Sequence, residues 1–180
     1  RGELDDGEFG NAALQLQLLH ERVLTPQEQV EFMLLSAQMH LGSNEPEIAG
    51  EYLNQLTQHM NYATPEQELR ASLLKARWYE SNGEYLAAAR ERDFLSGALN
   101  PEQREQNHEQ IWQDLMAMPE VELLEWAEKT PATQFGDWLR LAAISRNSRL
   151  TLDEHLAAVT TWREQNPAHP AAIQLPGGLA

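Results

Sequence analysis

Apolar side chains recur every three or four positions along most of this 180-residue chain, which is the spacing of one face of an α-helix. Phe32, Leu35 and Met39 show the pattern in one segment, and the series around Leu115 shows it in another. Together with helix start and stop signals, this spacing predicts nine helices, over residues 9–22, 26–41, 45–59, 65–82, 84–97, 101–117, 119–129, 133–146 and 153–165.

The predicted helix starts share one capping pattern. Thr25, Thr64 and Asn100 are each followed by Pro and then, two residues later, by Glu or Gln. The Thr or Asn side-chain oxygen can accept a hydrogen bond from an unpaired backbone N–H of the first turn, and the Glu or Gln side chain can accept one from the backbone N–H of the capping residue. Pro lacks a backbone N–H, but at the first helical position that N–H would have no partner within the helix. Thr151 begins a fourth such box without the proline. The first three starts lie 39 and 36 residues apart, which indicates a repeat.

The turns between helices repeat as well. Gly7, Asn44 and Gly83 are spaced 37 and 39 residues apart, and Gly and Asn tolerate the left-handed conformation that ends a helix. Each unit is therefore predicted to be a helix, a tight turn and a helix. By this pattern, the first predicted helix is the second member of its helix pair. The first member of that pair is therefore expected upstream of Arg1.

The best unit spans residues 64–99 and is similar to a tetratricopeptide repeat, which is normally ~34 residues long. It has the small, aromatic, Gly, aromatic, small spacing in the series Ala76, Tyr79, Gly83, Tyr85 and Ala88. Arg92 departs from the pattern, because a further aromatic is usual there. The fold is predicted to be all-α, a tetratricopeptide-like array of antiparallel helix pairs in a right-handed superhelix. Residues 1–166 are the predicted helical domain, and 167–180, rich in Pro and Gly, the predicted start of a linker.

Composition excludes several classes of protein. There are 27 Leu, 22 Ala, 22 Glu and 15 Gln against four Val and four Ile, which excludes an all-β fold and disfavours a parallel sheet. The formal net charge of −15 makes nucleic acid and anionic membrane surfaces poor partners. The absence of cysteine excludes disulfides, thiolate zinc sites and cysteine nucleophiles. No apolar run approaches the ~20 residues of a transmembrane helix.

No pattern of catalytic or metal-ligating residues is present in the sequence. No histidines are paired as HExxH or lie three or four positions apart, the six being His20, His40, His59, His108, His155 and His169. Carboxylate neighbours such as Glu120 with Glu125, or Asp5 with Asp6, are typical of a solvated helix surface in so Glu-rich a chain. Nucleophile-elbow, phosphate-loop and dinucleotide fingerprints are absent. We therefore predict no enzyme, no cofactor and no metal, and assign no catalytic or binding residue.

Aromatic and basic residues suggest binding surfaces, although a structural role is the simpler interpretation. The five tryptophans are expected to fill the core and the space between helices, with an interface anchor as the alternative; they are Trp78, Trp112, Trp126, Trp138 and Trp162. The densest basic patch is Arg140, Arg146 and Arg149. It is expected to pair with its own Glu-rich neighbours, and an acidic partner or glycan is the alternative.

The C-terminal third carries an ordered series of short motifs. Residues 107–118 have the form N-x-x-x-I/T-W-Q-x-L-x-x-M, and 136–141 follow as a G-W-L-x-L segment. Trp162, the run 166–172 and Leu175-Pro176 complete the series. In this order and spacing it resembles the N-terminal domain of the LpoA family, the penicillin-binding protein activator lipoproteins of Gram-negative bacteria. The preceding helical repeats also suit that domain.

The resemblance implies a function that composition does not reveal. Proteins of this family are tethered by lipid to the inner leaflet of the outer membrane and span the periplasm. They stimulate a bifunctional class A penicillin-binding protein that makes peptidoglycan. Their N-terminal domain is a tetratricopeptide-like array, and a C-terminal domain shaped like a periplasmic substrate-binding protein docks the synthase. For this chain, the lipidated cysteine is then expected upstream of Arg1 and the docking domain after Leu175-Pro176.

From this resemblance we hypothesise a non-catalytic spacer and interaction module in a periplasmic, outer-membrane-anchored activator of cell-wall synthesis. Two alternatives remain from the helical repeats. The chain is either a generic tetratricopeptide scaffold that binds a peptide in a concave groove, or the helical superhelix of a soluble lytic transglycosylase. The sequence that follows Ala180 in the full gene would discriminate among the three.

Overall fold

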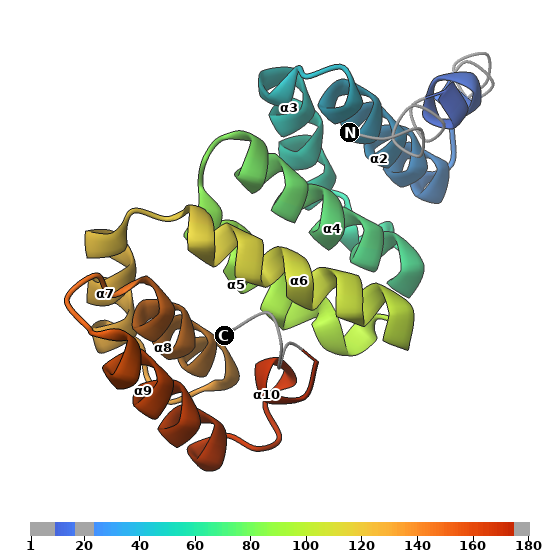
Figure 1. Ribbon diagram of the computed structural model, residues 1–180. Coiled ribbons are helices and arrows are strands. Elements are labelled where there is room, and N and C mark those ends of the chain that lie inside the picture. The colour runs from blue at the N-terminus through green and yellow to red at the C-terminus, as the bar shows by residue number, and fades with distance from the viewer. Residues whose placement is uncertain (1–9, 17–23, 175–180) are drawn as a thin grey trace. The chain divides into compact units, whose positions relative to one another are not determined.

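All regular elements described by the computed structural model are helices, which confirms the all-α prediction (Figure 1). The structure describes residues 10–16 and 24–174. Contacts divide the chain into an N-terminal unit, residues 1–84, and a C-terminal unit, residues 85–180. The division falls within the best sequence repeat, at the turn that follows Gly83. None of the described helices is both long and apolar enough to cross a membrane.

The N-terminal unit is built around one central helix. Its elements after the helical residues 10–16 are α2 (Pro26–Gly42), α3 (Pro46–Thr57), the 3-10 helix η1 (Met60–Tyr62) and α4 (Pro65–Ser81). Helix α2 packs against both α3 and α4, and its Val30 and Leu34 are fully buried. The Trp78 indole of α4 lies against Gly50 and donates to the Pro46 carbonyl oxygen at 2.8 Å. This contact joins α4 to the start of α3.

The C-terminal unit contains the larger core. Its elements are α5 (Tyr85–Leu95), η2 (Ser96–Ala98), α6 (Pro101–Ala117), α7 (Glu120–Lys129), α8 (Gln134–Arg146), α9 (Leu152–Gln165) and α10 (Pro170–Gln174). Helix α5 packs against α6, and α8 packs against α6, α7 and α9. Ile111, Leu115, Trp138 and Leu141 are fully buried where these helices meet. Helix α8 is therefore the element on which the unit is organised.

The predicted helix boundaries agree with the structure to within two residues. The prediction over 9–22 can be compared only at residues 10–16, because its other residues lie outside the described ones. The predicted break after α9 is also present. Beyond it the structure adds the short helix α10, in which Ala171 is fully buried. A domain boundary at residue 166 stays a prediction.

All four predicted capping boxes are present with both of their hydrogen bonds. The side chains of Thr25, Thr64, Asn100 and Thr151 accept from the third helical N–H, and the Glu or Gln at that position accepts from the capping residue's own N–H. Each cap contributes about 1 kcal/mol. The sequence therefore specifies the starts of α2, α4, α6 and α9 locally.

Two of the predicted turn residues have the left-handed backbone conformation, and the third, Gly7, lies outside the described residues. Asn44 has φ 59° and Gly83 has φ 75°. After α4, the Gly83 N–H donates to the Glu80 carbonyl oxygen at 3.1 Å and the Glu84 N–H to that of Tyr79 at 2.9 Å. This is the Schellman pattern that terminates a helix on a left-handed residue.

Replacing Gly83 by Val is expected to destabilise the chain by about 2 kcal/mol, because a β-branched residue resists a positive φ. Thermal unfolding measures the effect as a lower melting temperature. The matched control is Asn44→Gly, which keeps a residue that accepts the left-handed conformation and should leave the melting temperature nearly unchanged. A Gly83→Val protein that melts with the wild type would refute the turn.

Candidate functional site

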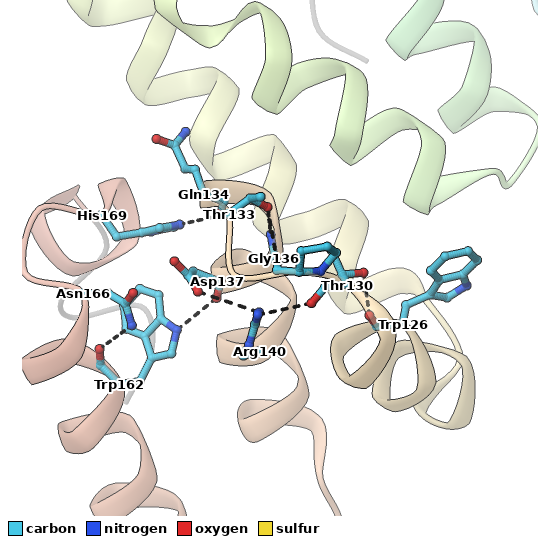
Figure 2. Close-up of polar contacts among 11 residues, drawn as sticks. Trp126, Thr130, Thr133, Gln134, Gly136, Asp137, Arg140, Trp162, Asn166 and His169 are labelled. Atoms are coloured by element: carbon cyan, nitrogen blue, oxygen red, sulfur yellow. Dashed lines mark hydrogen bonds and ion pairs between the residues drawn. The ribbon is translucent and has the colours of Figure 1, made fainter.

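The connection from α7 to α8 is a tight corner formed by residues 130–133 (Figure 2). The Thr133 hydroxyl accepts from the Gly136 N–H at 3.0 Å and so caps α8. At Gly136, a Cβ atom would overlap the carbonyl oxygen of Pro131. The corner therefore closes only over a glycine, and the Gly136 of the G-W-L-x-L segment has a packing role.

Two rings near the end of the chain hold α9 and α10 against α8 (Figure 2). The Trp162 indole N–H donates to the Asp137 carbonyl oxygen at 3.0 Å. The His169 ring packs edge-on against Trp162, at 5.0 Å between ring centroids, and against the buried Trp138, at 4.9 Å. Aromatic pairs of this kind contribute about 0.5–1.5 kcal/mol beyond the area they bury. The late motif residues therefore complete the core of the C-terminal unit.

The hydrogen bonds of His169 determine which ring nitrogen carries its proton. Nδ1 accepts from the Ala171 backbone N–H at 3.1 Å, so Nε2 must carry the proton and donate to the Gln134 carbonyl oxygen at 2.9 Å. Burial lowers the pKa of His169 below its ordinary 6.5, although the Gln134 bond and the carboxylates of Asp137 and Asp93 oppose the shift. A second proton would have to sit on Nδ1, against the Ala171 N–H.

The chain is therefore expected to lose stability as the pH falls below 6.5, because the unfolded state binds the His169 proton before the folded state does. Melting temperatures at about pH 7.5 and about pH 5.5 measure the loss. Replacing His169 by Gln should make the decrease smaller. Burial raises the pKa of Asp93 above 3.8, so the Asp93 carboxyl group favours the folded state as the pH falls and opposes the effect of His169. Asp93 is present in both the wild type and the His169→Gln variant. Equal decreases would contradict the assignment to His169.

A buried polar network joins α5 to α6. Arg92 Nη1 donates to Asn107 Oδ1 at 3.1 Å, and Asn107 Nδ2 donates to the Arg92 carbonyl oxygen at 2.8 Å. Arg92 Nε lies 3.8 Å from Asp114 Oδ2, and the Gln110 amide donates to Asp114 Oδ1 at 2.9 Å. The motif of residues 107–118 therefore supplies the partners of a buried cation. That cation stands where a tetratricopeptide repeat usually has an aromatic.

The three arginines of the predicted basic patch have different contacts in the structure. Arg140 lies 3.7 Å from the Asp137 carboxylate and donates to the Thr130 carbonyl oxygen at 3.2 Å (Figure 2). Arg146 donates to two carbonyl oxygens at the end of α6, where helical partners are missing. Arg149 is exposed in the loop before α9. The expected pairing with an acidic neighbour is thus seen for Arg140, whereas Arg146 binds backbone carbonyl groups.

His108 and His169 both pack against the Trp138 ring, and the other described histidines each have a separate polar partner. His59 and His155 bond to backbone carbonyl oxygens, and His40 lies 3.1 Å from the Glu45 carboxylate. His20 lies outside the described residues. Within the ranges 10–16 and 24–174, no group of three or more His, Asp or Glu side chains is placed to hold a metal ion.

Of the carboxylate neighbours from the sequence, Glu120 is held by hydrogen bonds that favour its ionised form. Glu120 Oε1 accepts from the backbone N–H and the hydroxyl of Ser148, both at 2.8 Å. These bonds lower the pKa of Glu120, so they favour the carboxylate and oppose a general-acid role. Glu125 is exposed, and the Asp5–Asp6 pair lies outside the described residues.

A solvent-open cavity of about 350 Å³ lies in the N-terminal unit, between residues 10–16, α2 and α4. Its lining is mostly polar and consists of Asn11, Ala12, Gln15, Glu31, Leu35, Gln38 and Arg70. Arg70 Nη1 lies 2.7 Å from both carboxylate oxygens of Glu31. The ion pair fixes one wall of the cavity, and the amide side chains leave hydrogen-bonding groups along the others.

Trp126 on α7 is the one exposed tryptophan of the five, at 36% exposure. The Arg90 guanidinium of α5 lies 5.9 Å from the Trp126 ring centroid and 5.3 Å from that of Phe135. Lys129 Nζ lies 6.0 Å from the Trp126 centroid. Figure 2 shows the Trp126 indole pointing away from Arg140 and its polar partners. These four residues, Arg90, Trp126, Lys129 and Phe135, form the Trp126 cluster.

The cluster is the strongest candidate for a binding surface, and the sequence indicates only part of it. Trp126 is one of the five tryptophans that the sequence offers as possible anchors, and Lys129 follows it by three positions, which places both on one helix face. Arg90 lies 36 residues before Trp126, so no local pattern connects the two. Only the packing of α5, α7 and α8 brings the cation to the ring.

Comparisons with known proteins agree with the ordered motifs. The chain is 26% identical over 187 residues to the penicillin-binding protein activator LpoA of Vibrio cholerae serotype O1, an alignment that covers 99% of this chain and 29% of that protein. The corresponding protein of Photobacterium profundum is 26% identical over 177 residues, which covers 98% of this chain and 28% of that protein. The chain thus spans less than a third of the length of these curated relatives.

Solved structures share the fold. Full-length LpoA from Haemophilus influenzae aligns with a TM-score of 0.75 at 22% identity, over 94% of this chain and 31% of that one. The separate N-terminal domain of the same protein aligns with a TM-score of 0.75 at 22% identity, over 94% of this chain and 79% of that one. The family model described as LppC putative lipoprotein matches residues 4–180. The chain therefore belongs to the LppC putative lipoprotein family.

Proposed function

We propose that this chain is the non-catalytic helical domain of a penicillin-binding protein activator, in which it acts as a spacer and interaction module. The match of the LppC family model over residues 4–180 carries the proposal, together with relatives that are named penicillin-binding protein activators. Membership of a lipoprotein family supports a place in the cell envelope. The protein is then periplasmic and anchored by lipid to the outer membrane, and its partner is a class A penicillin-binding protein.

The packing of the C-terminal unit supports a spacer role. Helix α8 is tied to α7 through the Gly136 corner and to α9 and α10 through Trp162 and His169. Helix α5 is tied to α6 through the buried Arg92–Asn107 bonds. Helices connected by several directional contacts resist sliding and hinge motion. Such a unit can hold a neighbouring domain in a fixed position, and contact with the synthase is assigned to that further domain.

Peptidoglycan synthesis by the class A synthase tests the proposal. Full-length activator should stimulate the synthase, whereas the 180-residue chain alone should not. In cells, replacing this segment of the full-length protein by a flexible Gly/Ser linker should reduce activation, because a flexible chain does not hold a fixed distance. Full stimulation by the isolated chain, or undiminished activation with the flexible linker, would overturn the spacer role.

A further inference from the structure

In the Trp126 cluster, Trp126 is 36% exposed with cations beside its ring, whereas Phe135 is buried. The Arg90 guanidinium lies within cation–π distance of both rings, at 5.9 Å from the Trp126 centroid and 5.3 Å from the Phe135 centroid. Phe94, one helical turn after Arg90 on α5, is 87% exposed. Large aromatic side chains are usually buried, and rings left exposed beside an ordered cation are typical of binding surfaces.

The two cations of the cluster are available to a ligand. In residues 24–174, neither Arg90 nor Lys129 forms an ion pair with a carboxylate, although the whole chain has 28 acidic residues and only 13 Lys and Arg. Arg70 and Arg92, by contrast, lie beside Glu31 and Asp114. A partly exposed indole with two such cations near its ring favours a ligand that has a flat apolar surface and a negative charge.

We infer that the Trp126 cluster binds a glycan strand that carries carboxylates, with a sugar ring stacked on Trp126 and a carboxylate between Arg90 and Lys129. A pyranose ring has an apolar C–H face that matches the exposed part of an indole, and Trp is enriched where one face is apolar and the surroundings are wet. The inference rests on the proposed function, because the acidic glycan that an activator of cell-wall synthesis meets is the cell-wall strand with its carboxylate-bearing stem peptides.

Charge distinguishes this ligand from nucleic acid. Stacking rings and cations also bind single-stranded nucleic acid, but a phosphate on every nucleotide would be repelled by a chain of net charge −15. A glycan carries its carboxylates at wider intervals, so a local pair of cations can meet one of them. An acidic peptide is the other chemical class that could occupy the cluster, and the binding test includes it.

Calorimetric titration of the 180-residue chain tests the inference. The probes are soluble uncross-linked peptidoglycan strands, neutral N-acetylglucosamine oligomers and a Glu-rich peptide. The peptidoglycan strands should bind more tightly than either of the others. Replacing Trp126 by Ala should weaken their binding about tenfold or more. Arg90→Gln and Lys129→Gln should each weaken it about 3-fold and reduce its sensitivity to salt.

Three further variants separate the cluster from general effects. Lys75 lies 5.9 Å from the Tyr79 ring in the N-terminal unit, so Lys75→Gln removes a similar cation–ring contact elsewhere and should leave binding unchanged. Glu122 is exposed one turn before Trp126, and its carboxylate repels the carboxylate of a bound strand. Glu122→Gln should therefore tighten strand binding about 2-fold. If Trp126→Ala lowers the melting temperature, Trp126→Phe replaces it in the test. Phe keeps an aromatic ring at this position, so this variant should retain part of the affinity.

Clear results would overturn the inference. Wild-type affinity for the peptidoglycan strands in Arg90→Gln and Lys129→Gln excludes the cluster as the site. Equal affinity for the neutral oligomer removes the role of charge, and tighter binding of the Glu-rich peptide assigns the surface to proteins. The synthase assay with the full-length activator is independent: stimulation by the full-length protein without strand binding by this chain refutes only the glycan site, and strand binding without stimulation by the full-length protein refutes only the proposed function.

Discussion

Replacing Gly136 by Ala is expected to destabilise the C-terminal unit by about 3 kcal/mol or more. Inside a helix, Ala normally stabilises by about 1 kcal/mol relative to Gly. Here the added Cβ would overlap the Pro131 carbonyl oxygen and lie 2.9 Å from Arg140 Nη1. The Pro131 oxygen belongs to the backbone of the corner, so it cannot rotate away as a side chain can. The clash is therefore larger than the gain in helix propensity.

Urea unfolding measures this loss as a lower midpoint, and two other glycines give a graded control. At Gly97 an added Cβ would have no neighbouring atom within 4 Å, so Gly97→Ala should change stability by less than about 0.5 kcal/mol. At Gly50 the nearest atom is a side-chain atom of Trp78, at 2.9 Å, and the cost of Gly50→Ala should be intermediate. A Gly136→Ala midpoint equal to that of Gly97→Ala would contradict the corner geometry.

The features that the sequence predicts correctly are those in which the interacting groups lie close along the chain. Each capping box joins residues three positions apart, such as Thr64 and Gln67, and the turn at Gly83 involves only the end of its own helix. Such signals act through local backbone bonds, so a short window of sequence contains both partners. Helix α10 is not predicted, because its stability comes from burial of Ala171 against distant helices.

The candidate site could not be predicted in the same way, because its members meet only through tertiary packing. Arg90 reaches Trp126 across 36 positions, and the exposure of Trp126 depends on which face α7 buries. The resemblance identifies residues 107–118 and 136–141 as motifs but gives no physical reason for them. The structure supplies it: Asn107 binds buried Arg92, and Gly136 makes room for a backbone oxygen.

Removing either charge of the Arg92–Asp114 pair is expected to destabilise the C-terminal unit by about 3–5 kcal/mol. The two side chains are 10% and 1% exposed. Asp114→Leu removes the carboxylate that lies beside the buried guanidinium. Arg92→Met leaves the carboxylate buried and also removes the bond to Asn107 Oδ1. The double variant Arg92→Met/Asp114→Leu should be more stable than the more damaging single variant, because apolar groups then replace both charges.

A partly exposed ion pair in the same chain tests whether burial, rather than distance, sets the size of this effect. Arg70 Nη1 lies 2.7 Å from Glu31, closer than the 3.8 Å between Arg92 and Asp114, but its partners are 31% and 26% exposed. Water screens that pair, so Arg70→Gln should cost at most about 1 kcal/mol. Equal costs for Arg70→Gln and Asp114→Leu in urea unfolding would contradict this ranking. Fully additive losses in the Arg92/Asp114 double variant would show that the two charges do not act as a pair.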